Sequence, residues 1–576
     1  MIGDFLITFG GGSESPPARA RQPWSLSATL GVACLYLTQS DDQWQGFPML
    51  EAEDALWKAW LLGEFYEKAG SLSQWFEHPE KLNGHFLLVG YEKTRKQVHV
   101  ITDRLGTIHV YHAKKGAKAA LGTFSPAVAH TAGREFLDFQ AMAEFFHFGF
   151  FLNDSTYWQE VRLMPGATHT IIDGTGQILS QSAYWHWHYQ PVQGFTTNEA
   201  IDQFQGLFRE VLCSQVKNKR IALPLSGGLD SRSTLAELGK DDLGGAAQIY
   251  LFSYGYTAGS VETTIARQLG NLRGMPVRTW DVQPYLFDQL ERVCASVEGF
   301  QDITLCRQAY VIDELAANAD FVVAAHWGDV WLDDMGFLGQ KMLPDDRLSE
   351  TIVNKYAKKG SEILLKLFST NLPFDWEVAM AGKIQDKLTV LSGIDDLDFK
   401  VKAWKTSDWS FRWTLSSLRM FQAGLFPLLP FYDNRLVDFF LRVPGEMVVG
   451  RKLQIDYLKR YAPDLAKVNW QPYNANLYQY QNFNTWLLPH RAIQKLKRIL
   501  FPQPITQRNW EVQFLNKQGR SGLKVYLLEH GLKLHQLFSV KDLQQLLNDF
   551  YQEPDASRGY AVSMLLTVSA WLEQYG

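Results

Sequence analysis

Short apolar runs alternate with polar turns up to about residue 190. The stretch HFLLVGYEKTRKQVHVITDRLG (85–106) predicts a strand, a polar turn and a second strand. THTIIDGTGQIL (168–179) repeats this hairpin pattern around Asp173 and Gly174. EDALWKAWLLGEFYEKAG (53–70), in contrast, is predicted to be a helix. We therefore expect this half of the chain to be mainly antiparallel sheet with a few helices.

Strands and helices alternate in the second half, after a predicted linker, QPVQGFTTNEA (190–200). The runs RIALPL (220–225), AQIYLFSYG (247–255) and ADFVVAAHWGD (319–329) predict buried strands, with helical patterns between them. Alternation of this kind predicts a parallel sheet with helices on both faces. The fold class expected is thus α/β.

Ligands on such sheets bind beyond the carboxyl ends of the strands. Those ends fall at Ser226, Ser253 and His326. From about residue 400 the pattern is mainly helical, and it predicts a closing amphipathic helix, GYAVSMLLTVSAWLEQYG (559–576). The candidate site is therefore expected in the middle of the chain.

Composition excludes several classes of function. The 576 residues are 46% hydrophobic and 20% charged, with a net charge of −5, so we expect neither nucleic acid nor a membrane as partner. The four cysteines lie far apart and form no C-x-x-C, which argues against a disulfide framework or a zinc site. The first residues carry no secretory signal pattern, and we expect a cytoplasmic protein.

The stretch LPLSGGLDSRSTLAEL (223–238) carries the most specific chemical signal. Its glycine pair, between a strand and a helix, lets backbone N–H groups approach a ligand, and the helix N-terminus favours an anion such as phosphate. No Gly-Lys-Ser/Thr follows, which excludes a Walker A loop, and no G-x-G-x-x-G occurs there, which argues against dinucleotide binding. The structural alternative is a turn in which Asp230 caps the helix.

This S-G-G-x-D-S loop resembles the pyrophosphate loop (PP-loop) of the ATP pyrophosphatases. The resemblance implies ATP and Mg²⁺ as ligands, with pyrophosphate oxygens held by the loop. The residues implied at the nucleotide are Leu225, Ser226, Gly227, Gly228, Asp230, Ser231, Ser253 and Gly328. Those implied at the metal are Asp230 and Asp329.

Motifs in both halves occur in the order typical of asparagine synthetase-type enzymes. LNGHFLLVGYEKTRKQVHVITDRLGTIHVYH (82–112) resembles part of that family's glutamine amidotransferase domain. FVVAAHWGDVWLDDMGF (321–337), GLFPLLPFYDNRLVDFFLRVP (424–444) and GRKLQIDYLKRYAPDLA (450–466) resemble segments of its synthetase domain. The resemblance implies an Ntn-like αββα sandwich at 1–190 and an ATP-dependent synthetase domain at 195–576, with a helical C-terminal part.

The activity implied is an AMP-forming carbon–nitrogen ligase. It would activate a small-molecule or peptide carboxylate as an acyl-adenylate, release pyrophosphate, and transfer the acyl group to ammonia or an amine. The family's glutaminase cysteine stands at the mature N-terminus, whereas this chain begins Met1-Ile2-Gly3-Asp4. Cys34 is expected to be a buried strand residue. We therefore expect no glutamine hydrolysis.

The synthetase half also departs from the family pattern. An acid and an arginine are replaced by Phe426 and Leu428, which would suit a less polar acceptor or be ordinary core residues. The family's downstream lysine is missing from NWQPYNANLY (469–478), so Lys452 is expected to supply the catalytic cation, with Lys467 as the other candidate.

A further departure concerns the second acidic segment, where Val330 replaces an acid. Asp333 and Asp334 follow it and either compensate or lie on an exposed helix face. Two other functions stay open: a β-lactam- or lasso-type cyclising synthetase, and an ATP-binding pseudoenzyme that serves as a scaffold in a biosynthetic cluster. The sequence also leaves open whether the chain forms a homodimer.

Overall fold

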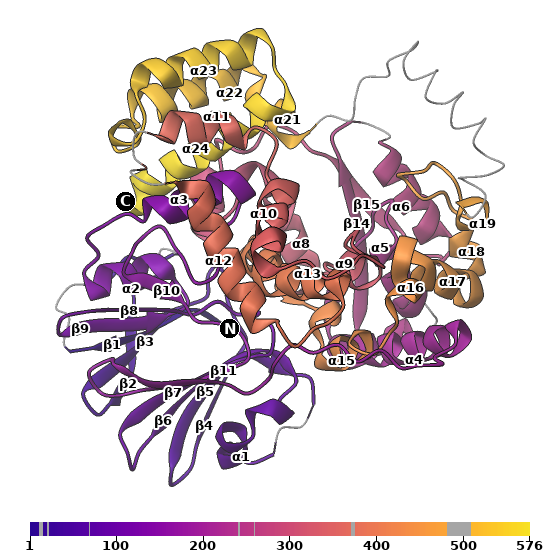
Figure 1. Ribbon diagram of the computed structural model, residues 1–576, viewed down its shortest axis with the longest axis horizontal. Coiled ribbons are helices and arrows are strands. Elements are labelled where there is room, and N and C mark those ends of the chain that lie inside the picture. The colour runs from indigo at the N-terminus through magenta and orange to yellow at the C-terminus, as the bar shows by residue number, and fades with distance from the viewer. Residues whose placement is uncertain are drawn as a thin grey trace.

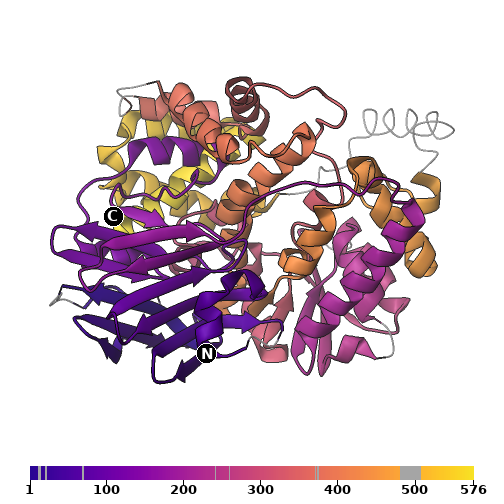
Figure 2. The same ribbon diagram turned by 60° about the horizontal axis from the view of Figure 1, so that its bottom comes forward.

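The computed structural model describes residues 1–10, 15–19, 22–67, 70–239, 242–257, 260–369, 372, 375–480 and 508–576. A sandwich of two antiparallel sheets is followed by a parallel α/β unit and then by helices (Figure 1). Figure 2 shows the two sheets of the sandwich stacked beside the α/β unit. The α/β fold class predicted from the sequence is confirmed.

Both sheets of the sandwich have six strands. The first has the order β10 (Val161–Leu163), β8 (Tyr111–Lys115), β9 (Lys118–Gly122), β1 (Ile2–Phe9), β3 (Ala33–Gln39), β2 (Ser25–Leu30). The second has the order β12 (Ile178–Ala183), β11 (Thr168–Ile172), β7 (Gln97–Thr102), β6 (Gly84–Glu92), β5 (Trp57–Phe65), β4 (Met49–Glu53). The predicted hairpins are confirmed, because β6 pairs with β7 and β11 with β12, both antiparallel.

The sequence interpretation of 53–70 as a helix is wrong, because 57–65 form strand β5. Trp60 and Leu62 face the core between the two sheets, while Trp57 and Leu61 face a second core on the outer side of the sheet. A strand buried on both faces shows no alternation of polar and apolar residues, so its pattern cannot be distinguished from that of a buried helix. Residues 68 and 69 lie outside the described residues.

The parallel sheet of the second half has the order β15 (Val277–Asp281), β14 (Gln248–Gly255), β13 (Arg220–Pro224), β16 (Phe321–Val323), β17 (Phe426–Leu428). Every neighbouring pair is parallel, as predicted. The chain winds outward from β13 in one direction through β14 and in the other through β16. This reversal opens a crevice at the carboxyl ends of β13 and β16.

Helices cover the sheets and fill the rest of the chain. In the first 340 residues they are α1 (Leu72–Glu77), α2 (Ser125–Ala132), α3 (Phe139–Phe148), α4 (Thr197–Val216), α5 (Asp230–Leu238), α6 (Val261–Asn271), α7 (Leu290–Val297), α8 (Ile312–Asn318) and α9 (Gly328–Trp331). Helix α4 begins within the last residues of the predicted linker, at a capping box in which Thr196 and Glu199 exchange hydrogen bonds.

The later helices include those beyond residue 400, which confirm the helical pattern predicted there. They are α10 (Asp345–Tyr356), α11 (Ser361–Phe368), α12 (Trp376–Val390), α13 (Leu397–Lys405), α14 (Leu415–Leu418), α15 (Asn434–Phe440), α16 (Gly445–Val448), α17 (Lys452–Tyr461), α18 (Pro463–Ala466), α19 (Leu477–Tyr480), α21 (Asn509–Phe514), α22 (Lys517–Lys524), α23 (Val540–Gln552) and α24 (Ala556–Tyr575). Among the described residues, no helix is both long enough and apolar enough to span a bilayer.

The sequence predicted that the closing helix α24 would be amphipathic. This prediction is wrong, because the helix is buried on almost every side. It packs beside α3 and α11 (Figure 1). The hydroxyl of Tyr560 donates a hydrogen bond to the carbonyl of Phe146 at 2.9 Å, and the ring of Trp571 stacks on Tyr157 with centroids 3.8 Å apart. The C-terminal helix thus contributes to the core that joins the two halves of the chain.

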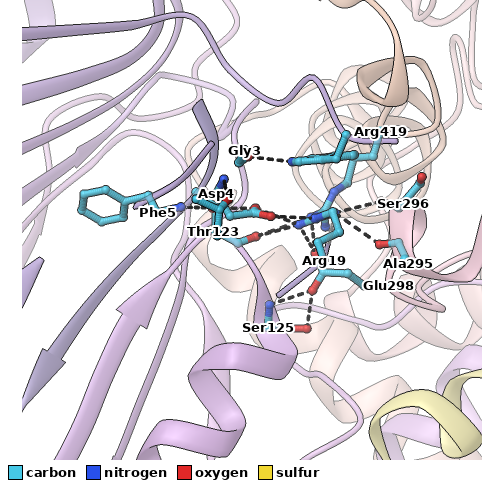
Figure 3. A network of polar contacts seen from close by, with 12 residues as sticks. Gly3, Asp4, Phe5, Arg19, Thr123, Ser125, Ala295, Ser296, Glu298 and Arg419 are labelled. Carbon is cyan, nitrogen blue, oxygen red and sulfur yellow. Dashed lines mark hydrogen bonds and ion pairs between the residues drawn. The ribbon is translucent and has the colours of Figure 1, made fainter. Parts of the chain in front are cut away.

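A buried cluster of charges ties the sandwich to the second half (Figure 3). Arg19 contacts Asp4 of β1 and Glu298, which follows α7, each at 3.0 Å. Arg419 also contacts Glu298, whose other oxygen accepts a hydrogen bond from the backbone N–H of Ser125 at 2.7 Å. The cluster holds two positive and two negative side chains, so its charges compensate one another.

Other contacts between the two halves decide the role of Phe426 and Leu428, which the sequence left open. Both are fully buried in β17, and Phe426 belongs to the core between the sheets of the sandwich. Its ring stacks on His85, with centroids 4.7 Å apart. Phe426 and Leu428 are therefore core residues.

Cys34 lies in β3 as predicted, but it is only partly buried.

The charge cluster predicts a large loss of stability when one member is neutralised. Glu298→Gln leaves Arg19 and Arg419 without a full countercharge in a buried site, so we expect the free energy of unfolding to fall by about 3–5 kcal/mol. The matched control is Glu350→Gln, which breaks an exposed pair with Arg347 and should cost less than about 1 kcal/mol. Urea unfolding followed by circular dichroism measures both, and equal losses would contradict a structural role for the cluster.

Candidate functional site

A cavity of about 1180 Å³ lies at the carboxyl ends of the parallel strands, where the winding direction reverses. The loop after β13 forms one side of it, and the segment from β16 into α9 forms another. Predicted site residues that line this cavity are Leu225, Ser226, Asp230, Ser231, Ser253 and Asp329. The structure thus brings together residues that lie more than 100 positions apart in the sequence.

The glycine-rich loop is held by its own hydroxyl groups. Ser226 donates its backbone N–H to Oγ of Ser231 at 3.2 Å, and the N–H of Gly228 reaches Oγ of Ser226 at 3.2 Å. Behind the loop, a Cβ on Gly227 would lie 2.4 Å from Oε1 of Gln471, so this position admits only glycine without movement. Gly227 and Gly228 do not themselves line the cavity, but they allow the loop its close packing.

Gly328 has a similar role at the start of α9. A Cβ on it would lie 2.9 Å from Cγ of Asp230 and 2.8 Å from the ring of Phe431. The residue before it, Trp327, has the left-handed φ of 77°, a conformation that costs energy in a residue other than glycine. The backbone at α9 is thus bent so that it approaches Asp230 closely.

The carboxylate of Asp230 is held from one side only. Its Oδ1 accepts hydrogen bonds from Nη2 of Arg451 and from Nε2 of Gln454, the latter at 3.0 Å. Its Oδ2 accepts none from the described residues. Burial raises the pKa of Asp230, Arg451 opposes that shift, and the charge of Asp329 adds to it. The two carboxylates together therefore favour a bound cation.

The residues present fit a magnesium ion that arrives with a phosphate ligand. Mg²⁺ in proteins commonly takes one or two carboxylates, with substrate phosphates and water as its other ligands. Asp230 and Asp329 would supply the two carboxylates. Among the described residues no group of three or more His, Cys, Asp or Glu side chains is placed to hold a metal, so the remaining ligands would come from the bound molecule and water.

Arg451, and not the expected Lys452, is the basic residue that contacts Asp230 of the loop. Lys452 is the first residue of α17, is exposed, and does not line the cavity, and Lys467 is also exposed. Arg451 precedes the helix with a left-handed φ of 65°, and its guanidinium contacts Asp230. The sequence does not indicate which of the two adjacent basic residues, Arg451 or Lys452, faces inward.

Asp333 and Asp334 form neither an exposed helix face nor part of the cavity lining. They follow the end of α9, and both are half-buried. Oδ1 of Asp333 accepts a hydrogen bond from the backbone N–H of Gly450 at 2.8 Å. Asp333 thereby holds the segment that carries Arg451, and it does not reach the cavity wall where Val330 replaces the expected acid.

Several buried polar atoms of the cavity wall have no hydrogen-bond partner among the described residues. A buried polar atom without a partner costs free energy, so such a cluster in one wall indicates that a polar ligand supplies the missing bonds. These atoms are Oγ of Ser253, Oε1 of Gln301, Oε1 of Gln308 and Nδ1 of His326. Gln301 and Gln308 were missed by the sequence analysis, because no motif marks them.

Part of the sandwich matches a known protein family. Residues 64–185 match the family model of the glutamine amidotransferase domain, which is well under half of the chain. No curated protein matches. The matched segment runs from the end of β5 through β12, that is, through most of the second sheet.

Two solved structures show weak similarity. One, described as the allosteric regulatory enzyme of purine biosynthesis, is 9% identical, with 50% of this chain and 76% of that chain covered and a TM-score of 0.19. The other is glutamine phosphoribosylpyrophosphate amidotransferase from B. subtilis complexed with ADP and GMP, at 8% identity, 51% and 92% coverage and a TM-score of 0.21. TM-scores this low carry no argument. The family match shows that the front domain of this chain is glutamine amidotransferase-like.

Proposed function

We propose that the chain is an ATP-dependent amide-forming ligase of the asparagine synthetase type, acting in the cavity at the end of β13. One observation carries the proposal: the S-G-G-L-D-S loop and Asp329 border the same cavity on the two sides of the winding reversal. Open sheets of this kind bind ligands at that point. The glutamine amidotransferase-like front domain agrees with chemistry that transfers nitrogen.

In this proposal the loop holds the β- and γ-phosphates of ATP. Backbone N–H groups near the start of α5 and the hydroxyls of Ser226 and Ser231 donate hydrogen bonds to them. Leu225, Ser253 and Gly328 border the rest of the nucleotide. Asp230 and Asp329 would hold Mg²⁺, which would supply positive charge to stabilise the leaving pyrophosphate.

The substrate carboxylate then attacks the α-phosphorus. A new P–O bond forms, the bond to the β-phosphate oxygen breaks, and pyrophosphate leaves. The nitrogen lone pair of ammonia or an amine attacks the carbonyl carbon of the resulting acyl-adenylate, the C–O bond to AMP breaks, and the nitrogen loses a proton. Arg451 acts as a positioning residue, because it contacts Asp230 and not the cavity.

We further propose that the front domain does not hydrolyse glutamine. Cys213 lies in α4, whereas Cys294 and Cys306 are buried, and burial raises the pKa of both buried thiols, which disfavours the nucleophilic thiolate. Cys34 is a strand residue paired with β1. Nitrogen would then come from free ammonia or from an amine of the substrate.

A cyclising synthetase, in which the carboxylate and the amine belong to one molecule, is a second candidate. The cavity favours it, because about 1180 Å³ exceeds the roughly 300–1,000 Å³ of most small-molecule pockets. Such a volume accommodates a nucleotide together with a second molecule larger than an amino acid.

Asp230 and Arg451 provide the first test. We expect Asp230→Ala to reduce carboxylate-dependent ATP–pyrophosphate exchange by on the order of 10²–10³-fold, because a preorganised charge is lost. Arg451→Met should reduce exchange too, whereas Lys452→Met, which changes the exposed neighbour, should not. Exchange is measured over a panel of carboxylates, with circular dichroism as the folding control. Exchange that survives Asp230→Ala, or that fails only in Lys452→Met, would contradict this assignment.

The raised pKa of Asp230 predicts a pH dependence of magnesium-dependent ATP binding. A proton competes with the metal for this carboxylate, so binding should weaken as the pH falls, and should do so above the pH of about 4 at which an ordinary aspartate titrates. The folded state takes up this proton more readily than the unfolded state, so protonation of Asp230 does not itself unfold the protein. Calorimetric titration of Mg·ATP at several pH values measures the effect. Affinity independent of pH down to 4 would exclude Asp230 as the metal ligand.

Glutamine and ammonia should differ as nitrogen donors. With any carboxylate that supports exchange, we expect ammonia or an amine to give amide, and glutamine to give none, because Cys294 and Cys306 are buried and the other two cysteines lie within a strand and a helix. Glutamate release from glutamine is the measurement, and a Cys34→Ser variant is the control. Glutamate formed well above background in the unmodified protein, and lost in Cys34→Ser, would show that the front domain is an active glutaminase.

A further inference from the structure

The cavity extends beyond the nucleotide loop to a wall of lysine and tryptophan side chains. Lys405 ends α13, Lys358 lies between α10 and α11, and Trp409 and Trp413 belong to a π-helical segment, Thr406–Thr414. We call Lys358, Lys405, Trp409 and Trp413 the Lys–Trp subsite. π-Helical turns are rare and occur frequently at functional sites.

The two ammonium groups lie on the same aromatic ring. Nζ of Lys358 and Nζ of Lys405 are each 5.0 Å from the ring centroid of Trp409, and Lys358 is also 5.3 Å from that of Trp413. Both side chains are half-buried, and burial lowers the pKa of each. Neither ammonium group forms an ion pair or a hydrogen bond with a described residue.

Two acids act on this pair of lysines electrostatically, but neither contacts an ammonium group. Asp302 acts on Lys358 electrostatically, but its Oδ1 is occupied by Thr304 and Ser563. Asp329 acts on Lys405 electrostatically, and the proposed function assigns it with Asp230 to the metal. Contact with the indole rings offsets part of the cost of holding two like charges in a partly desolvated wall, and an anion bound between them would offset the rest.

We propose that the Lys–Trp subsite binds a second acidic group of the carboxylate substrate, so that the substrate is a dianion with a planar apolar body. This inference rests on the proposed function, since it takes the other carboxylate to be the one activated beside the loop. Ammonium groups recognise a carboxylate by charge-assisted hydrogen bonds, and indole rings recognise a planar body by stacking. The subsite would thus select the substrate and aim its reacting end at the nucleotide.

Binding without ATP tests the subsite separately from the reaction. Calorimetry would compare succinate, terephthalate and biphenyl dicarboxylate with the matched monoacids butyrate, benzoate and biphenyl carboxylate. We expect the aromatic diacids to bind about 10-fold or more tightly than their monoacids. The double variant Lys358→Met with Lys405→Met should lose this preference, whereas Lys366→Met, an exposed lysine of α11 outside the cavity, should retain it.

Three results would overturn the inference. They are equal binding of every diacid and its monoacid, an unchanged preference in the double variant, and a double variant that loses Mg·ATP affinity but not diacid affinity. The last result would assign the lysines to the nucleotide phosphates.

These outcomes do not depend on the ligase activity. A protein that prefers diacids but shows no ATP–pyrophosphate exchange would leave the subsite standing and refute the proposed function. A protein that shows exchange but no preference for diacids would refute the subsite and leave the proposed function standing.

Discussion

The reversal of winding between β13 and β16 is the constraint on which the candidate site depends. Two neighbouring parallel strands whose connections leave in opposite directions cannot both be covered at their carboxyl ends, so a crevice remains there. The S-G-G-L-D-S loop and α9 enter this crevice from its two sides. The close approach of Gly328 to Asp230 then fixes the distance between them.

Contacts of charged side chains hold several other segments of the chain around that crevice. Arg451 and Gln454 bring α17 onto Asp230, and Asp333 fastens the segment before α17. Farther away, the Arg19–Glu298 contact joins the sandwich to the second half, where buried charges pair with one another. In the cavity wall, by contrast, Lys358 and Lys405 have no countercharge in contact, which is why a ligand is inferred there and not at the structural cluster.

Local patterns were sufficient for much of the fold. The β6–β7 hairpin, the strands of the parallel sheet and the loop after β13 all follow from short-range periodicity and glycine placement. Strand β5 could not be predicted, because burial on both faces removes the alternation that marks a strand. Arg451 and the Lys–Trp subsite could not be predicted either, because backbone conformation and tertiary packing, rather than a motif, place these side chains.

A structure determined with Mg²⁺ and the non-hydrolysable analogue α,β-methylene-ATP tests the central claim most directly, because it requires no knowledge of the carboxylate substrate. The account predicts the β- and γ-phosphates in hydrogen-bond contact with residues 226–231 and the metal in contact with both Asp230 and Asp329. A nucleotide bound elsewhere, or a metal in contact with neither carboxylate, would contradict it.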